Sequence, residues 1–260
     1  MLREWRARRG FSQLDVSHAS GISVRHLSFV ETGRAKPTKG TLLAIAETLD
    51  IPLRERNRLL EAAGLAAAYA QTSLEAAEMA HLREVLQFLL NSHEPFAALV
   101  LDRYANCIMS NRAAARLIRS LAEPSLLTGG KLNHLRIVFH PQGARRFIVN
   151  WDEVSGHMLE RVERELTRFA DDVQGAELLA ELRGYSPGAP PMAARHDIRP
   201  DDLLLPVHIR KGDIDLRIYS AIMTLGMPRD VLLQELRIET FFPADAASQA
   251  AWEKLLVAET

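Results

Sequence analysis

The hydrophobic residues near the start of the chain recur at helical spacing, and serines stand where that spacing breaks. Ser12 can cap a helix over residues 13–20, because a serine hydroxyl accepts hydrogen bonds from the free N–H groups of a first turn. Ser23 can cap a second helix through Val30 in the same way. Gly21 lies between the two, where the chain must turn with a positive φ. We therefore expect two short helices joined by a tight turn.

Helical spacing continues beyond this pair of helices. Apolar residues recur over 39–50, and the pattern extends to Gly64, a residue type that commonly ends helices. An alanine-rich and then polar stretch over 65–75 is typical of a joint between domains. A helix with a leucine-rich face is expected next, over 74–92.

The remainder of the chain mixes helical and alternating patterns. Strands are expected as a pair within 96–110 and then over 203–209, 214–225 and 233–242, with helices over 112–121, from Asp152, and over 176–182. Lys211-Gly212 is a predicted hairpin turn. This order, a strand pair, then helices, then a meander, predicts an antiparallel sheet of about five strands with helices, an α+β fold.

The pattern divides the chain into four segments: an all-helical domain at 1–65, a linker and connecting helix at 66–94, an α+β domain at 95–246, and a tail or helix at 247–260. Net charge also distinguishes the first of these segments from the rest of the chain. Residues 1–65 hold eleven Lys or Arg against seven Asp or Glu, a net charge of +4, and the remainder holds twenty-one against twenty-six, a net charge of −5. A basic first domain suits contact with phosphate.

The two capped helices have the spacing of a helix-turn-helix, whose second helix enters the major groove of DNA. Arg25 can take guanine in bidentate fashion, while Val24 or Phe29 can touch a thymine methyl. Basic residues after this helix, and Gln13 at the start of the previous one, are placed to bond phosphates. The residues expected to contact DNA are Gln13, Ser23, Val24, Arg25, Ser28, Phe29, Arg34 and Lys36.

The run SQLDVSHASGISVRHLSFVETGRAKPTKGTLLAIAETLDIPLRERNRLLEAAG resembles the phage-repressor-like regulators of the xenobiotic-response-element family. The resemblance implies a five-helix, lambda-repressor-like DNA-binding domain. It also implies that Arg6 pairs with Glu31, near the end of the recognition helix. Two positions depart from the family pattern: Ser17 stands where Ala is usual, and Ser20 occupies an apolar site before the turn.

Four later segments resemble the ligand-binding domain of the MmyB-like transcription regulators: HEPFAALVLDRYANCIMSNRAAARLI, NHLRIVFHPQGARRFIVNWDEV, AELLAELRGY and GMPRDVLLQELRIETFFPAD. The resemblance spans about residues 93–246. It implies a PAS-like fold with a five-stranded antiparallel sheet, and a small apolar ligand for which fatty acids are the leading candidates. No other cofactor is expected.

A cavity for such a ligand needs apolar walls and a few polar anchors. The candidate walls are Val100, Tyr104, Ile108, Val138, Phe139, Ile218, Tyr219 and Met223, and the candidate anchors are Asn111, Arg136, His140 and Arg217. The alternative for each apolar residue is an ordinary place in the core.

Other classes of protein lack support in the sequence. Gly184-Tyr185-Ser186-Pro187-Gly188 matches G-x-S-x-G, but Pro187 has no N–H for an oxyanion hole, so we expect a turn and no enzyme. The histidines show no metal-ligand spacing. Cys107, the single cysteine, is interpreted as a small buried hydrophobe, with redox sensing as the alternative. With no membrane span and no signal peptide in the pattern, a cytoplasmic protein is expected.

Two hypotheses follow. In the first, the chain is a ligand-responsive transcription regulator that binds double-stranded DNA as a homodimer, since one helix-turn-helix reads only a half-site. In the second, it is a constitutive DNA-binding protein whose second domain dimerises or recruits a partner. The helix over 74–92 either carries the dimer contact or packs on the sheet. An enzyme fused to a DNA-binding domain has no paired nucleophile and base to support it.

Overall fold

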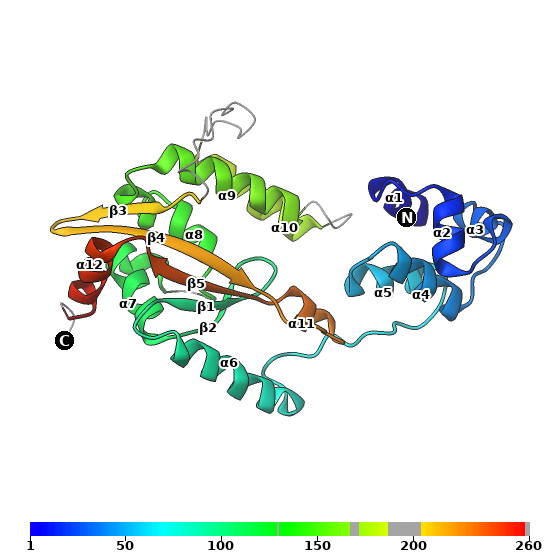
Figure 1. Cartoon of the computed structure of the whole chain (residues 1–260), viewed down its shortest axis with the longest axis horizontal. Coiled ribbons are helices and arrows are strands. Elements are labelled where there is room, and N and C mark those ends of the chain that lie inside the picture. Colours follow the sequence, from blue (N-terminus) through cyan, green and yellow to red (C-terminus); the bar gives the residue numbers. More distant parts are fainter. Residues whose placement is uncertain (129, 167–171, 187–203, 258–260) are drawn as a thin grey trace. The chain divides into compact units, whose positions relative to one another are not determined.

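The computed structural model describes residues 1–128, 130–166, 172–186 and 204–257 (Figure 1). The chain forms two compact units. The N-terminal unit comprises residues 1–74 together with 225–234, and the sheet unit comprises the rest. Each unit is described by itself below.

The N-terminal unit contains five helices at its start: α1 (Leu2–Arg8), α2 (Gln13–Ser20), α3 (Val24–Glu31), α4 (Lys39–Thr48) and α5 (Leu53–Ala62). Their shared core includes Leu27, Ile45 and Leu60, all completely buried. The predicted all-helical domain is confirmed, and each helix lies within a few residues of its expected place.

The local signals that predicted the helix-turn-helix are present in the structure. The Ser12 hydroxyl accepts from the Asp15 N–H at 3.1 Å, and the Asp15 carboxylate accepts from the Ser12 N–H at 2.7 Å, which together form a capping box. The Ser23 hydroxyl accepts from the His26 N–H at 3.3 Å. Gly21 has a φ of +73°, in the left-handed region where a Cβ is disfavoured. These contacts fix where α2 ends and α3 begins.

A buried ion pair joins α1 to the end of α3. The Arg6 guanidinium donates to both oxygens of Glu31, at 2.7 and 3.0 Å, which confirms the pairing implied by the family resemblance. Gln13 donates to the same carboxylate at 2.7 Å. Burial raises the pKa of the Glu31 carboxyl, but the hydrogen bonds from Arg6 and Gln13 outweigh burial and hold that pKa below its ordinary value.

The segment 225–234, between two strands of the sheet unit in sequence, belongs to the N-terminal unit. The Val231 N–H donates to the Ala70 carbonyl at 2.8 Å, and the Thr72 N–H donates to Asp230 at 2.9 Å. The Leu53 N–H donates to the Gln234 side chain at 2.7 Å. Leu53 opens α5, whose own N-cap residue is a proline without a side-chain cap, so Gln234 satisfies an otherwise free N–H.

The sheet unit is built on five strands: β1 (Ala98–Leu101), β2 (Cys107–Ser110), β3 (Val207–Lys211), β4 (Ile214–Met223) and β5 (Arg237–Pro243). Every pair of neighbours is antiparallel, in the order β2-β1-β5-β4-β3. The last strand in sequence therefore lies at the centre of the sheet. The expected α+β fold, with a strand pair followed by helices and a three-strand meander, is confirmed.

The helices of the sheet unit are α6 (Ala80–Ser92), α7 (Arg112–Leu121), α8 (His134–Phe139), α9 (Trp151–Leu166), α10 (Val173–Tyr185) and α12 (Ala246–Val257). The short helix α11 (Val231–Glu235) spans the boundary with the N-terminal unit, and single 3₁₀ turns η1 (Ala77–Met79), η2 (Pro124–Leu126) and η3 (Ala144–Phe147) complete the set. Helices α9 and α10 pack against each other, and α12 packs against β4 (Figure 1).

Three elements differ from the sequence-based expectation. Residues 132–139, for which no element was predicted, contain α8, which is too short for a helical period to show. Strand β3 begins at Val207, after Pro206, and the expected start at Leu203 lies outside the described residues. The segment expected to be a strand from Leu233 contains part of α11 before β5 begins.

The strand register separates the sheet into two faces. Leu99 pairs with Glu239, and Ser220 pairs with Phe241, so these four side chains share one face because side chains alternate along a strand. Val100 pairs with Ile238 on the opposite face, and both are buried. The first face carries the cavity described below.

We expect Glu31→Gln to lower the free energy of unfolding of the N-terminal unit by about 3 kcal/mol near neutral pH, because Arg6 loses its buried anion. The native pKa of Glu31 lies below its ordinary value of 4.5, so the wild-type advantage is present above that pH and is lost as the pH falls through the native pKa. Urea unfolding followed by Trp5 fluorescence, in a background with Trp151 and Trp252 replaced by Phe, measures both effects.

Glu47→Gln is the matched control, since Glu47 is exposed and lies on α4 of the same unit. A Glu31→Gln protein as stable as this control would contradict the structural role of the ion pair.

Candidate functional site

Helix α3 presents a mixed basic and apolar face to solvent. Val24 and Arg25 are exposed, Ser28 and Phe29 are half-buried, and Leu27 on the other side is buried in the core. The Arg25 guanidinium lies 5.4 Å from the centre of the Phe29 ring, a cation–π contact that holds the arginine over the helix surface. A bidentate donor beside apolar groups is the set that reads guanine and thymine edges in the major groove.

Exposed basic side chains follow helix α3 in the sequence. Gly33, with a φ of +73°, turns the chain, and the Arg34 N–H donates to the Phe29 carbonyl at 2.8 Å. The side chains of Arg34, Lys36 and Lys39 are exposed and form no ion pair within the part of the chain that the structure describes. They remain available to phosphate oxygens.

Two of the expected DNA-contacting residues have internal partners. Gln13 donates to Glu31, where a phosphate contact was expected, so its amide fastens α2 to α3. The Ser23 hydroxyl caps α3. Ser20, the departure before the turn, donates to the Val16 carbonyl at 2.6 Å and accepts from the Ile22 N–H at 3.3 Å, so its hydroxyl is satisfied.

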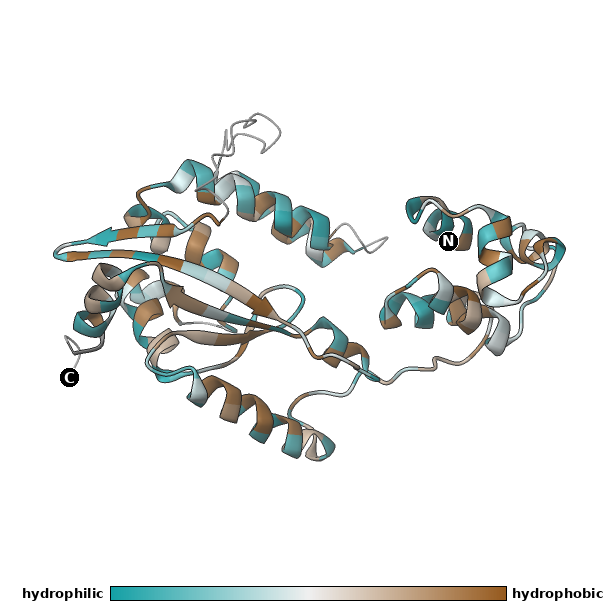
Figure 2. Ribbon diagram, viewed as in Figure 1, coloured by the Kyte–Doolittle hydropathy of each residue, from teal (hydrophilic) through white to brown (hydrophobic). Residues whose placement is uncertain are grey.

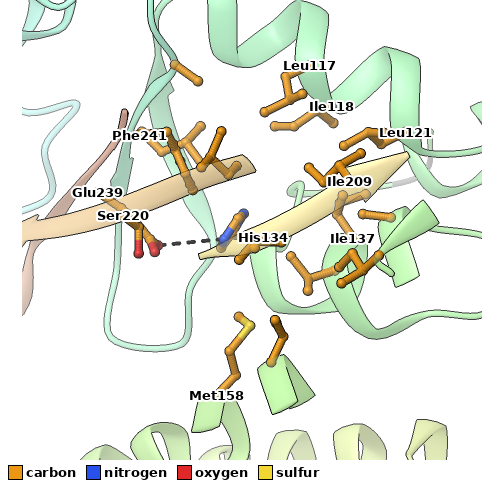
Figure 3. Close-up of a pocket in the computed structure, with 18 of the residues that line it drawn as sticks. Leu117, Ile118, Leu121, His134, Ile137, Met158, Ile209, Ser220, Glu239 and Phe241 are labelled. Atoms are coloured by element: carbon orange, nitrogen blue, oxygen red, sulfur yellow. Dashed lines mark ion pairs between the residues drawn. The ribbon is translucent and has the colours of Figure 1, made fainter. Parts of the chain in front are cut away.

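The sheet unit contains a partly open cavity of about 330 Å³ between the sheet and helices α7, α8 and α9 (Figure 3). Its walls are mostly apolar side chains, among them Leu117, Ile118, Leu121, Ile137, Met158, Ile209 and Phe241. This volume lies at the lower end of the range for small-molecule sites, about 300–1,000 Å³, and the lining has their usual apolar character.

Polar side chains gather in one part of this cavity. Nε2 of His134, on α8, lies 3.6 Å from the Glu239 carboxylate on β5, and both side chains are buried (Figure 3). Arg161 of α9 lies 3.8 Å from the other oxygen of Glu239. Burial lowers the pKa of His134, although the nearby Glu239 charge opposes this shift. The same three residues line a neighbouring hollow of about 40 Å³.

The cavity is not lined by the residues chosen from the sequence as its main ligand contacts. The nine are Val100, Tyr104, Ile108, Asn111, Arg136, Phe139, Arg217, Tyr219 and Met223, and each lies elsewhere in the sheet unit. Of the further candidates, Val138 and Ile218 do line the cavity, whereas His140 contacts Tyr185 edge-on.

Three of the four polar members of that set have side chains occupied by structural contacts, and among the described residues Arg217 is bonded only through its backbone. Asn111 caps α7 by accepting from the Ala114 N–H at 2.9 Å, and also bonds the backbone of β1. Arg136 pairs with Glu181 in a bidentate bridge, with bonds of 2.8 to 3.1 Å. The Tyr104 hydroxyl donates to Asp172 at 2.9 Å. The Arg217 N–H donates to Ser248 at 3.0 Å, and the side chain is exposed.

The apolar members face other neighbours. Val100, Tyr219 and Met223 lie on the sheet face opposite the cavity, as the pairing of β1, β4 and β5 shows. Phe139 is completely buried against Trp151, with ring centres 5.2 Å apart. Ile108 is half-buried in the edge strand β2. The alternation of side chains along β1 predicts that Leu99 and Leu101 share one face of the sheet and that Val100 lies on the other. Which of the two faces carries a cavity depends on how the helices pack, and the strand pattern does not show that.

The remaining chemical candidates carry no active-site arrangement. Ser186 follows the helix α10, not a strand, and Pro187 and Gly188 lie outside the described residues. Within the described residues no group of three His, Cys, Asp or Glu is placed to hold a metal ion, and no helix is long and apolar enough to cross a membrane. Burial raises the pKa of the Cys107 thiol to about 11, which leaves little reactive thiolate near neutral pH.

Two family models match the chain. One, described as the MmyB-like transcription regulator ligand binding domain, matches residues 82–255. The other, described as helix-turn-helix, matches residues 2–56. No curated protein matches the chain. The helix-turn-helix match covers α1 to α4 and the start of α5, and the other match covers the sheet with its cavity, so both resemblances inferred from the sequence are confirmed.

Proposed function

The chain belongs to the family of MmyB-like transcription regulators with a helix-turn-helix, and on that premise we propose that a small apolar molecule in the cavity controls operator binding by α3. The observation that carries the proposal is the 330 Å³ apolar cavity in the domain that the ligand-binding model matches. A ligand that prefers one arrangement of the chain shifts its population by the difference in affinity between arrangements. The coupling between ligand and DNA is then reciprocal.

DNA recognition rests on the exposed side of α3. Arg25 and its neighbours contact base edges, while Arg34 and Lys36 contact phosphates. We propose that the operator is a pseudo-palindrome read by a homodimer, since one such helix reads only a half-site. A protein with this role works in the cytoplasm, where operator DNA is.

The apolar side of α6 is the proposed dimer contact. Figure 2 shows that much of the α6 ribbon is hydrophobic. Val85, Phe88 and Leu89 lie on one side of the helix at spacings of three and four residues, and Phe88 is 70% exposed. Leu86 and Leu90, on the other side, are completely buried. The helix therefore both packs on the sheet unit and presents a second apolar side, which a second copy of the chain would cover.

Fatty acids are the proposed class of apolar ligand, on the strength of the family resemblance and the apolar walls. His157 and Arg164, exposed side chains of α9 that also line the cavity, offer positive charge or donors to a carboxylate at its rim. Under the alternative function, a constitutive DNA-binding protein, the cavity would hold nothing and its lining would serve only as core.

Arg25→Ala is expected to weaken operator binding by roughly 1–3 kcal/mol and to relax preference at one base position. The operator is first selected from random DNA with the wild-type chain, and binding is measured by gel shift at fixed salt. Lys36→Ala should weaken all sequences alike. Unchanged binding by the Arg25→Ala protein would overturn the role of α3.

Native mass spectrometry of the purified chain is expected to show a co-purified lipid-like molecule. Ala114→Leu adds bulk to the cavity wall and should abolish that species, whereas Ala115→Leu, half-buried on the same helix and outside the lining, should retain it. Thermal unfolding of both variants checks that they fold. An empty wild-type cavity that takes up no added fatty acid would favour the constitutive alternative.

Phe88→Asp is expected to halve the mass of the particle in solution and to weaken operator binding, because a charge replaces the most exposed apolar group of α6. Light scattering after size-exclusion chromatography measures the mass. Gln87→Asp places the same charge at the adjacent exposed position and should leave the dimer intact. A Phe88→Asp dimer would show that another surface carries the contact.

A further inference from the structure

The polar groups in the cavity indicate more about the ligand than its apolar walls do. His134 and Glu239 are both buried, and Figure 3 shows them meeting among the apolar lining side chains. Nδ1 of His134 is buried and has no hydrogen-bond partner among the described residues. A buried polar atom without a partner is costly, so this atom marks where a ligand group would be stabilised.

The protonation of His134 follows from its surroundings. Burial lowers its pKa, so the ring is neutral near pH 7 and carries one N–H. Nε2 faces the Glu239 carboxylate at 3.6 Å, and a proton on that nitrogen is favoured because a lone pair there would face the negative oxygens. Nδ1 is then a bare acceptor.

The carboxylate of Glu239 is also an acceptor. The Arg161 guanidinium lies 3.8 Å from the second oxygen of Glu239. The positive charge nearest this part of the cavity is therefore already paired with the Glu239 carboxylate. Nδ1 and the carboxylate together suit a group that donates a hydrogen bond. They disfavour a second carboxylate, which would bring its charge next to Glu239.

We propose that the ligand carries a hydroxyl group on its aliphatic chain and donates it to His134 Nδ1 or Glu239 inside the cavity. This inference rests on the proposed ligand-binding function. It names the recognised chemistry as a hydroxylated chain, with any carboxylate left to the exposed rim near Arg164.

Three probes of equal chain length test the inference: 1-decanol, which has a donor, methyl decyl ether, which has none, and decanoic acid. Displacement of a fluorescent apolar dye from the full-length protein gives their affinities. The alcohol is expected to bind at least about tenfold more tightly than the ether, as expected for one hydrogen bond to a buried, unpaired acceptor.

Variants assign that preference to its residues. Glu239→Gln should weaken the alcohol, because a neutral amide replaces the charged acceptor, and should leave the acid unchanged, because its carboxylate lies at the rim. His134→Leu should abolish the preference of alcohol over ether, and His134→Asn, which keeps an oxygen acceptor, should restore part of it. Met158→Leu changes only an apolar wall and should leave the ratio unchanged.

Equal binding of alcohol and ether would overturn the hydroxyl inference while leaving the proposed ligand-binding function intact. If none of the three probes displaces the dye, the proposed function itself fails and the inference fails with it.

Discussion

The placement of β5 between β1 and β4 is the constraint on which the sheet unit depends. The central strand comes near the end of the chain, so β1 and β4 cannot join into one sheet until that late segment arrives. Closing so long a loop carries an entropic cost that the pairing must recover. Because side chains alternate along the strand, the same pairing sends Glu239 and Phe241 into the cavity and Ile238 to the opposite face. The pairing of β5 that completes the sheet therefore also forms one wall of the cavity.

Local signals in the sequence were enough to predict much of the fold. Ser12, Gly21 and Ser23 each act through their immediate neighbours, and the structure has each in its expected role. Helix α8 was missed because its six residues span fewer than two turns, too few for periodicity to be measured. Helix boundaries that depend on residues distant in sequence could not be predicted either. One example is the N-terminus of α5, where the Gln234 side chain accepts a hydrogen bond from the Leu53 N–H.

The candidate site was less accessible to such reasoning. Asn111 and Arg136 have the chemistry of ligand anchors, yet a helix cap and an ion pair with Glu181 occupy them. His134 and Glu239 stand far apart in sequence and become neighbours only in the folded chain, where His134 Nε2 lies 3.6 Å from the Glu239 carboxylate. Within the described residues, the side chains of Arg34 and Lys36 after α3 are exposed, and His134 Nδ1 in the cavity wall is buried without a hydrogen-bond partner.

The assignment of residues 225–234 to the N-terminal unit has a consequence for how the protein can evolve and be engineered. The N-terminal unit is not one continuous segment that ends at the linker. Residues 225–234 belong to it, although they lie between two strands of the sheet unit in sequence. A fragment cut after residue 74 would lack the partners of Ala70, Thr72 and Leu53. A chimaera that joins this helical bundle to a foreign sensor at one junction would lose the same three bonds. An exchange that keeps the three bonds of this chain must therefore move two separate stretches of sequence together.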